Sequence, residues 1–177
     1  MSPARWWRGP RVRIALFALL FVPGAWLGAH TLHAAWSAQY RIGLDVQRVA
    51  CLPWQVYLIA RQPYKPTVER GDILMFRTDL ALFRRQFPGV DAIAKLVAGL
   101  PGDRIEVRDN QLFINGVYWD RLWLLGFLEA EDGAFDRTFV VPEGHYFLAG
   151  TAPGSYDGRY WGTITAEQVT GYVRPIW

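Results

Sequence analysis

An uncharged, apolar segment lies close to the amino terminus of the chain, directly after a cluster of arginines. Residues 14–29 read IALFALLFVPGAWLGA, and no charged residue follows until Arg41. These sixteen strongly apolar residues fall slightly short of the roughly 20 needed to cross the hydrocarbon of a bilayer, and the mildly apolar residues that follow supply the rest. We therefore expect one transmembrane helix over residues 14–36.

The distribution of positive charge predicts the orientation of this helix. Four arginines lie within the first 13 residues, and no Lys or Arg follows the apolar segment for more than ten residues. Basic residues favour the cytoplasmic side of a membrane. The sequence therefore predicts a cytoplasmic stretch over residues 1–13 and an extracytoplasmic domain over 37–177. In a bacterium this is a single-pass protein of the inner membrane, with its domain in the periplasm or outside the cell.

A cleaved secretory signal is the alternative interpretation of the same segment. Basic, apolar and small-residue regions occur in the order that such signals have, and Ala29, Ala34 and Ala35 offer small side chains for a cleavage site. Pro23 and Gly24 are expected to kink the helix under either interpretation. Both interpretations send the rest of the chain out of the cytoplasm.

Composition argues against several other kinds of protein. Aromatic residues make up 15% of the chain, with nine tryptophans, which argues against disorder. The net charge of +3 is concentrated at the amino terminus, so no surface for nucleic acid is expected. One cysteine and three unclustered histidines give no disulfide and no basis for a metal site. No cofactor is expected.

Beyond about residue 45 the sequence alternates short extended runs with turn signals. Strands are predicted over residues 56–60, 72–76, 104–108, 111–116, 138–141 and 145–150. Asp109-Asn110 and Asn115-Gly116 flank a predicted hairpin strand, because both pairs tolerate the positive φ of tight turns. Only Asp79–Leu96 is predicted to be helical, with Asp79 as N-cap and a break at Pro88-Gly89. We expect a mainly β, antiparallel domain after the single helix.

Four separated blocks together resemble the type I signal peptidase family. Cys51-Leu52-Pro53 with Tyr57 resembles the nucleophile box of the branch that processes conjugative pilins, which has Ser-x-Pro and a tyrosine four residues beyond. The other three blocks are RGDILMF at 70–76, KLVAGLPGDRI at 95–105, and VPEGHYFLAG at 141–150 followed by Ser155-Tyr156-Asp157-Gly158-Arg159. The resemblance covers roughly residues 45–172 and implies a signal-peptidase-like antiparallel β domain.

In this resemblance Cys51 stands where the family usually has its nucleophilic serine, and Lys95 matches the lysine base. Burial without a counter-ion disfavours the charge of a lysine, and a neutral amine can deprotonate a nucleophile. The residues around Lys95, from Ala92 to Val97, are apolar, which suits such burial. A thiol needs less help from a base than a hydroxyl, so a Cys51–Lys95 pair is chemically reasonable. The alternative is that Cys51 is a small buried apolar residue in an inactive protein.

The resemblance also implies residues that support the site. Ser155 matches the position whose hydroxyl binds the lysine, and Asp157 and Arg159 match a pair that braces the site. Ordinary turn residues are the alternative for the last two.

The sequence departs from the family at two places. Thr-Ala-Pro follows Gly150 where the broader family has Asp-Asn-Arg, and Val49 has no hydroxyl to donate to an oxyanion. The backbone N–H of Cys51 is then the expected donor in the oxyanion hole.

In the family the substrate lies extended between the segment before the nucleophile and the segment leading to the lysine. Small side chains in these segments leave room for Ala-like substrate residues. The residues expected to contact substrate are Gln47, Val49, Ala50, Pro53, Ile93 and Ala94.

The implied function is a membrane-bound endopeptidase that processes, or cyclises, a membrane-inserted precursor such as a conjugative pilin through an acyl-enzyme on Cys51. Its implied partners are the precursor and the lipid bilayer, with no nucleic acid or metal. Two alternatives stay open. One is a non-catalytic, membrane-anchored component of a conjugative pilus or secretion assembly, and the other is a general signal peptidase I.

Overall fold

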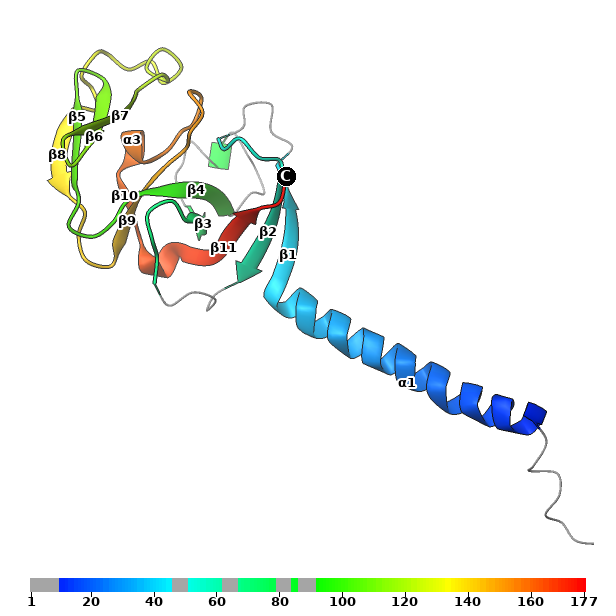
Figure 1. Cartoon of the computed structure of the whole chain (residues 1–177). Helices are drawn as coiled ribbons and strands as arrows, with labels where there is room; N and C mark the ends of the chain where they lie inside the picture. Colours follow the sequence, from blue (N-terminus) through cyan, green and yellow to red (C-terminus); the bar gives the residue numbers. More distant parts are fainter. Residues whose placement is uncertain (1–9, 46–50, 62–66, 79–83, 86–91) are drawn as a thin grey trace, which may run out of the picture. The chain divides into compact units, whose positions relative to one another are not determined.

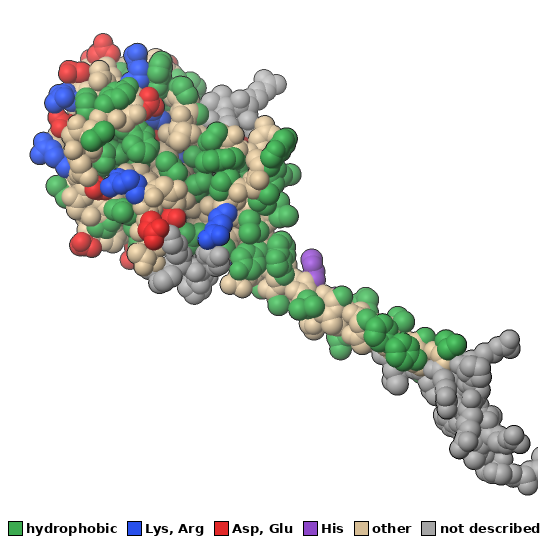
Figure 2. Space-filling model, in the orientation of Figure 1, with side chains coloured by type: hydrophobic (Ala, Val, Ile, Leu, Met, Phe, Trp, Pro, Cys, Tyr) green, Lys and Arg blue, Asp and Glu red, His purple; other side chains and the backbone are tan. Residues whose placement is uncertain are grey.

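A computed structural model describes residues 10–45, 51–61, 67–78, 84–85 and 92–177. The chain divides into two units, Met1–Tyr40 and Arg41–Trp177, which are described separately. The first contains helix α1 (Pro10–Gln39), which continues through Pro23 (Figure 1). Within it, Phe17–Gln39 has a mean hydropathy of 1.2 and is long and apolar enough to cross a membrane. On the face that Figure 2 shows, the coloured side chains of this helix are mostly hydrophobic, with a histidine and no Lys, Arg, Asp or Glu among them. A helix therefore occupies the segment that the sequence predicts to span the membrane.

The second unit contains two antiparallel sheets (Figure 1). The larger sheet has the order β1 (Tyr40–Leu44), β2 (Val56–Arg61), β11 (Val169–Pro175), β3 (Ile73–Arg77), β4 (Ala92–Gly99), β9 (His145–Ala149) and β10 (Thr163–Thr165). The smaller sheet has the order β7 (Val117–Arg121), β6 (Gln111–Ile114), β5 (Arg104–Arg108) and β8 (Arg137–Val140). The short helix α3 (Gly158–Trp161) and the 3₁₀ turn η2 (Ala166–Gln168) lie between β9 and β11 along the chain. The expected mainly β, antiparallel fold is confirmed.

The predicted hairpin strand and its two turns are present. Gln111–Ile114 forms β6, which pairs with β5 on one side and β7 on the other. Asp109, Asn110 and Asn115 have φ values of 51°, 57° and 51°, and Gly116 has 80°. Asn and Asp tolerate this left-handed region better than most residues with a side chain, and Gly adopts it freely. Local turn chemistry therefore sets this part of the smaller sheet.

The predicted helix over Asp79–Leu96 is wrong at its carboxyl-terminal end, because Ala92–Gly99 is strand β4. Side chains in β4 alternate between half-buried and buried from Ala92 to Val97, a period of two. Pairing with β3 and β9 outweighs the helix propensity of Ala, Leu and Lys in this stretch. Residues 84–85 are helical, whereas Asp79 and Pro88-Gly89 lie outside the described residues.

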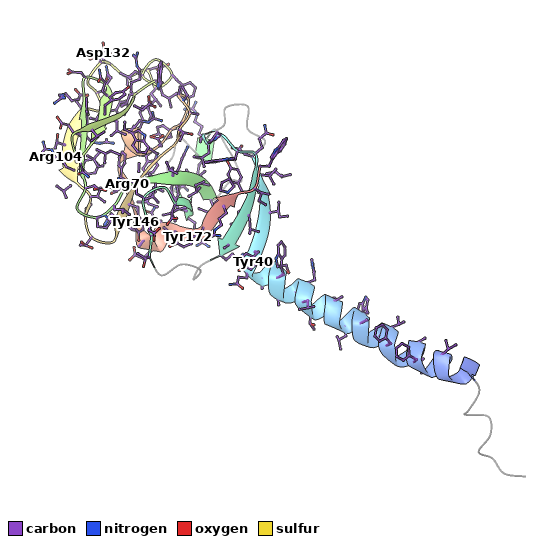
Figure 3. The ribbon with its side chains drawn as sticks, in the orientation of Figure 1. Tyr40, Arg70, Arg104, Asp132, Tyr146 and Tyr172 are labelled. Atoms are coloured by element: carbon purple, nitrogen blue, oxygen red, sulfur yellow. The ribbon has the colours of Figure 1, made fainter. Side chains whose placement is uncertain are left out.

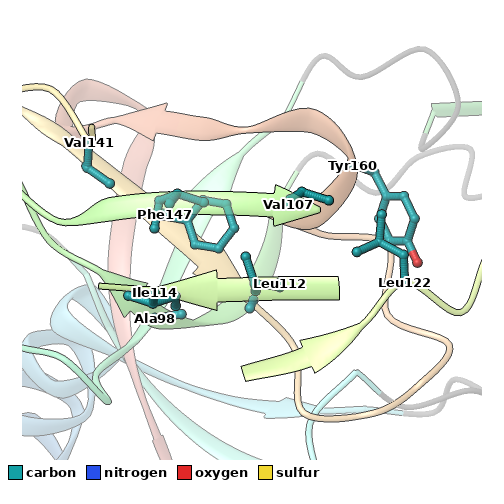
Figure 4. Close-up of a cluster of buried hydrophobic side chains, with 10 residues drawn as sticks. Ala98, Val107, Leu112, Ile114, Leu122, Val141, Phe147 and Tyr160 are labelled. Atoms are coloured by element: carbon teal, nitrogen blue, oxygen red, sulfur yellow. The ribbon is translucent and has the colours of Figure 1, made fainter. Parts of the chain in front are cut away.

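The main hydrophobic core joins the two sheets (Figure 4). Ile105, Val107, Leu112 and Ile114 from the smaller sheet pack with buried residues of β4, β9 and α3. Those partners are Ala98, Phe147, Ala149 and Tyr160. Close packing of this kind leaves side chains little room to shift. The core therefore fixes the positions of β4, β9 and α3, which carry or flank the candidate catalytic residues.

Candidate active site

Lys95 lies on β4, an interior strand of the larger sheet, and is buried, with 3% of its surface exposed. Its Nζ atom donates a hydrogen bond of 2.8 Å to the Oγ atom of Ser155, which is fully buried. Among the described residues, no carboxylate forms an ion pair with Lys95. Within the described residues, the Ser155 hydroxyl is thus the side-chain partner that the structure gives the Lys95 amine.

The loop after β9 brings Ser155 to this lysine. Leu96 of β4 pairs with Ala149 of β9, so the next residues along the same register are Lys95 and Gly150. Gly150 begins a loop that ends at Asp157, the N-cap of α3. We call residues 150–157 the site loop. Strand pairing thus places the start of the site loop directly beside the buried lysine.

The site loop also holds Cys51 through the main chain. The carbonyl oxygen of Cys51 accepts hydrogen bonds from the backbone N–H groups of Thr151 (3.0 Å) and Ala152 (3.3 Å). A Cβ atom added to Gly150 would overlap Ser155 Oγ and would lie 2.7 Å from the carbonyl oxygen of Cys51. The backbone of Cys51 and the side chain of Ser155 therefore crowd the same glycine. Cys51 itself is half-buried, and it is the only cysteine of the chain.

These main-chain bonds occur at a position where the sequence departs from the pattern that it resembles. Thr151 and Ala152 occupy positions where the broader family has other side chains, yet both contact Cys51 through N–H groups. Every residue except proline offers such a group. The bonds to Cys51 therefore do not depend on the side chains at these two positions.

The segment after Cys51 is anchored in a small hydrophobic cluster. Leu52 and Tyr57 are buried together with Ile73 and Val173. The Tyr57 hydroxyl donates a hydrogen bond of 2.6 Å to the carbonyl oxygen of Trp54. Burial raises the pKa of Tyr57, and the electrostatic influence of Asp45 acts in the same direction. Tyr57 therefore stays protonated and ties down the turn that carries the thiol.

Asp157 and Arg159 form a fully buried ion pair at the carboxyl-terminal end of the site loop. Arg159 donates to both carboxylate oxygens of Asp157, from Nε (2.9 Å) and from Nη2 (2.8 Å). Asp157 in turn accepts hydrogen bonds from the backbone N–H groups of Gly150 (2.8 Å) and Arg159 (3.1 Å). Burial alone would lower the pKa of Arg159, but the hydrogen bonds and charge of Asp157, with Tyr160 and Asp120, raise it. Arg159 therefore stays charged, and the hydrogen bonds of Asp157 to Arg159 and to the Gly150 N–H link the two ends of the site loop.

Two residues of the site are not singled out by the sequence pattern. Gly150 lies where an added Cβ atom would clash with Ser155 and with the carbonyl oxygen of Cys51. Asp120 on β7 binds Arg159 at 2.5 Å. The block VPEGHYFLAG contains Gly150 and is the signal that points to it. Asp120 lies in no motif, because its contact depends on how two sheets pack.

The predicted substrate-contacting residues fall in three groups. Gln47, Val49 and Ala50 lie outside the described residues. Pro53 is exposed, two residues after Cys51. Ile93 is buried on the face of β4 that also carries Lys95, and Ala94 is half-buried on the opposite face.

The first residues of strand β4 pair with a neighbouring strand on one side only. β3 pairs with Ala92–Leu96, whereas the described pairing with β9 begins at Leu96. In the described part of the chain, Ala92–Ala94 thus pair with β3 alone. An extended peptide can add to a strand edge through main-chain hydrogen bonds.

One loop contacts both a buried amine, through a serine hydroxyl, and the backbone of a cysteine. An amine, a hydroxyl and a thiol are side-chain groups that serve as base, orienting group and nucleophile in acyl-transfer sites. The family described as signal peptidase, peptidase S26, matches residues 32–177. The chain belongs to this family.

Relatives of this chain carry the same family name. It is 33% identical over 105 residues to a probable signal peptidase I-2 of Synechocystis, an alignment that covers 58% of this chain and 45% of the relative. It is 27% identical over 139 residues to signal peptidase I V of Bacillus subtilis, covering 66% of this chain and 82% of the relative. A solved signal peptidase I from Enterococcus faecalis has 31% identity and a TM-score of 0.40, covering 62% of this chain and 98% of that one.

Proposed function

We propose that this chain is a membrane-anchored, signal peptidase I-like endopeptidase that cleaves signal-peptide-bearing precursors through a thioester on Cys51. The observation that carries the proposal is the site loop, which binds the carbonyl of Cys51 at one end and the amine of Lys95 at the other. Family membership supports peptidase activity independently. The reaction needs no metal or cofactor.

The proposed mechanism begins with proton transfer from the Cys51 thiol to the Lys95 amine. The thiolate attacks the scissile carbonyl carbon, and the backbone N–H of Cys51 stabilises the oxyanion. The carbon–nitrogen bond breaks as Lys95 returns its proton to the leaving amine, which leaves a thioester on Cys51. Water, deprotonated by Lys95, then attacks the thioester, and the sulfur leaves and regains its proton.

Ser155 has two tasks in this mechanism. It accepts a hydrogen bond from the Lys95 amine, which orients the lone pair of the amine toward the thiol. It also provides a polar partner for the ammonium that forms when Lys95 takes the proton inside a buried site. A buried charge without such a partner would raise the barrier to the reaction.

Anchoring by α1 places this chemistry beside a membrane-inserted substrate. We propose that α1 is retained as a single span, with the amino terminus in the cytoplasm and the β domain outside it. A precursor whose signal sequence still crosses the bilayer then presents its cleavage site to the β domain, extended along Ala92–Ala94. Carbonate extraction and intact mass of the purified protein test this proposal. A mass that lacks the residues before Ala29, Ala34 or Ala35 would contradict a retained span.

We further propose that the substrate is a conjugative pilin precursor, on the strength of the short box Cys51-Leu52-Pro53 with Tyr57. In such a reaction the precursor's own amino terminus can replace water and attack the thioester. A new peptide bond then forms, the thiol is released, and the circular product is lighter by one water than the linear one. The relatives named signal peptidase I favour the general signal peptidase equally well.

Processing assays with matched variants test the activity. The full chain in detergent is incubated with a pilin precursor and, separately, with a general secretory precursor, and products are identified by intact mass. Cys51→Ala and Lys95→Ala are expected to abolish cleavage, whereas Cys51→Ser is expected to retain part of it. Lys65→Ala is the matched control, because Lys65 and Lys95 are the only two lysines of the chain.

The outcomes separate the three functions. Cleavage of the pilin precursor alone supports the pilin-processing proposal, and a product lighter by one water adds cyclisation. Cleavage of both precursors supports a general signal peptidase. Cleavage of neither by wild-type protein, with pilus assembly unimpaired in cells that carry Lys95→Ala, favours the non-catalytic assembly component and contradicts the proposal.

A further inference from the structure

Arg159 connects the site loop to a second carboxylate, which comes from the smaller sheet. Its Nη1 atom donates to Asp120 Oδ2 at 2.5 Å and to the carbonyl oxygen of Arg121 at 3.1 Å. Nε and Nη2 are used by Asp157 on the opposite side of the guanidinium. One buried guanidinium therefore spans from β7 to the N-cap of α3.

Asp120 is itself held in one orientation. Its other carboxylate oxygen, Oδ1, accepts a hydrogen bond of 3.2 Å from the indole N–H of Trp123. The Asp120 side chain is 26% exposed, whereas that of Arg159 is fully buried. A guanidinium is planar with a rigid fork of donors, so fixing Nη1 also fixes the plane that meets Asp157.

A bulge in the smaller sheet turns Asp120 toward Arg159. Leu112 of β6 pairs with Asp120, but the next residue, Phe113, pairs with Tyr118, so Trp119 is the extra residue of β7. Paired residues share one face of a sheet, and Leu112 is fully buried on the inner face. In a regular register Trp119 would lie opposite Leu112, and Asp120 would lie opposite the exposed Gln111. The bulge thus moves Asp120 from the outer to the inner face.

From these observations we propose that Asp120 is a positioning residue for the reaction, acting through Arg159 and Asp157 on the site loop. Asp120 fixes Arg159, Arg159 fixes the Asp157 carboxylate, and that carboxylate holds the N–H of Gly150. Gly150 contacts both Ser155 and the carbonyl of Cys51. The smaller sheet, which contributes none of the proposed reacting groups, thereby sets the geometry of the nucleophile and its base. This role rests on the proposed function.

The test compares Asp120→Asn with a matched control in the same sheet. Glu106 on β5 is similarly exposed, at 22%, and forms ion pairs with Arg104 and Arg108. It lies opposite Phe113 and Thr138, away from Arg159. Glu106→Gln therefore removes one carboxylate charge and its ion pairs without affecting the site loop. Asp120→Glu keeps the charge and serves as the conservative rescue variant.

Two quantities are measured on the full chain in detergent, each per folded molecule. The first is the split between kcat and KM on the cleaved precursor. The second is the rate at which iodoacetamide alkylates Cys51, which intact mass reports without ambiguity because the chain has one cysteine. Asp120→Asn is expected to lower kcat about ten- to a hundredfold with KM unchanged, since a shift of about 1 Å can cost about a hundredfold. It is also expected to change the alkylation rate, and Asp120→Glu is expected to restore part of both.

Equal kcat and alkylation rates in Asp120→Asn and Glu106→Gln would overturn the positioning role. So would a loss in Asp120→Asn that disappears after correction for the folded fraction, because the effect would then be on stability alone. Lys95→Met separates the two proposals. If Lys95→Met abolishes cleavage while Asp120→Asn behaves as wild type, only the positioning role fails. If Lys95→Met cleaves as well as wild type, the proposed function fails.

Discussion

Ser155 Oγ lies 2.8 Å from the Nζ atom of Lys95, and both residues are buried. They come from segments 60 residues apart, joined by the pairing of β4 with β9. Because both side chains are buried, the Lys95 amine can bind water in place of the Ser155 hydroxyl only if the site loop opens. The bond between these two side chains is therefore the contact on which the orientation of the proposed base depends.

Replacing Ser155 by Ala is expected to lower kcat while the protein stays folded. The Lys95 amine would lose its described hydrogen-bond partner, and an unsatisfied buried polar group costs about 1–3 kcal/mol. If that cost falls on the transition state, it corresponds to a decrease of roughly ten- to a hundredfold in kcat. Steady-state kinetics on the precursor measure the effect, and an unchanged kcat would show that Ser155 does not orient the base.

Gly150→Ala is expected to abolish cleavage. The added methyl group would overlap Ser155 Oγ and press on the carbonyl oxygen of Cys51. Gly126→Ala is the matched control, since its Cβ would meet no atom within 4 Å and its φ is not in the left-handed region. Comparable activity of the two variants would mean that the site loop tolerates displacement.

These two positions show what the sequence can predict about the site. Lys95 and Ser155 lie within contiguous blocks whose residue order alone is informative, and the structure brings the two side chains together. Turn residues such as Asn115-Gly116 are also predictable, because a positive φ is a local demand.

Other parts of the site follow from long-range pairing and leave no local pattern. Ala92–Leu96 contains good helix formers, and only its partners β3 and β9 make it a strand. Asp120 faces Arg159 because a bulge in β7 shifts its pairing with β6 by one residue. The carbonyl oxygen of Cys51 accepts hydrogen bonds from the backbone N–H groups of Thr151 and Ala152. The identity of these two side chains therefore does not predict the contact.

Asp157→Asn is expected to destabilise the β domain. The variant loses the carboxylate that pairs with the buried Arg159 and leaves that charge partly uncompensated. Breaking a buried ion pair from one side costs about 3–5 kcal/mol, and we expect the lower end because Asp120 still binds Arg159. Urea unfolding of the full chain measures the change in the free energy of unfolding. A loss below about 0.5 kcal/mol, typical of surface substitutions, would contradict a structural role for this pair.

Asp103 is expected to make the free energy of unfolding of the β domain depend on pH in the acid range. Burial acts to raise the pKa of Asp103, but hydrogen bonds from the Leu100 N–H, Asn115 and Arg70, with the charge of Arg70, outweigh it and lower the pKa. Arg70, labelled in Figure 3, also donates to the carbonyl oxygen of Ala98 on β4. Because the pKa is lowered on folding, the stabilisation is fully present above the ordinary value of about 4 and is lost as the pH falls through the lowered value.

Asp103→Asn therefore tests this linkage. The variant is expected to be less stable than wild type by about 1 kcal/mol at pH 7, a modest value because the Arg70 side chain is 42% exposed. The difference is expected to narrow as the pH falls below about 4, where Asp103 of the wild type takes up its proton. Unfolding free energies at a series of pH values check the trend. A difference that stays constant from pH 7 to acid would contradict it.

The thioester is the most direct test of the account as a whole. Wild-type protein is mixed with excess precursor, quenched in acid within one turnover and analysed by intact mass. We expect a covalent adduct of Cys51 with the amino-terminal part of the precursor, released by neutral hydroxylamine. Lys95→Met should form it about 10²–10⁴-fold more slowly, the usual contribution of a general base, while Lys65→Ala matches wild type. Cleavage of the precursor by Cys51→Ala at the wild-type rate, with no adduct on Cys51 in the wild type, would contradict the account.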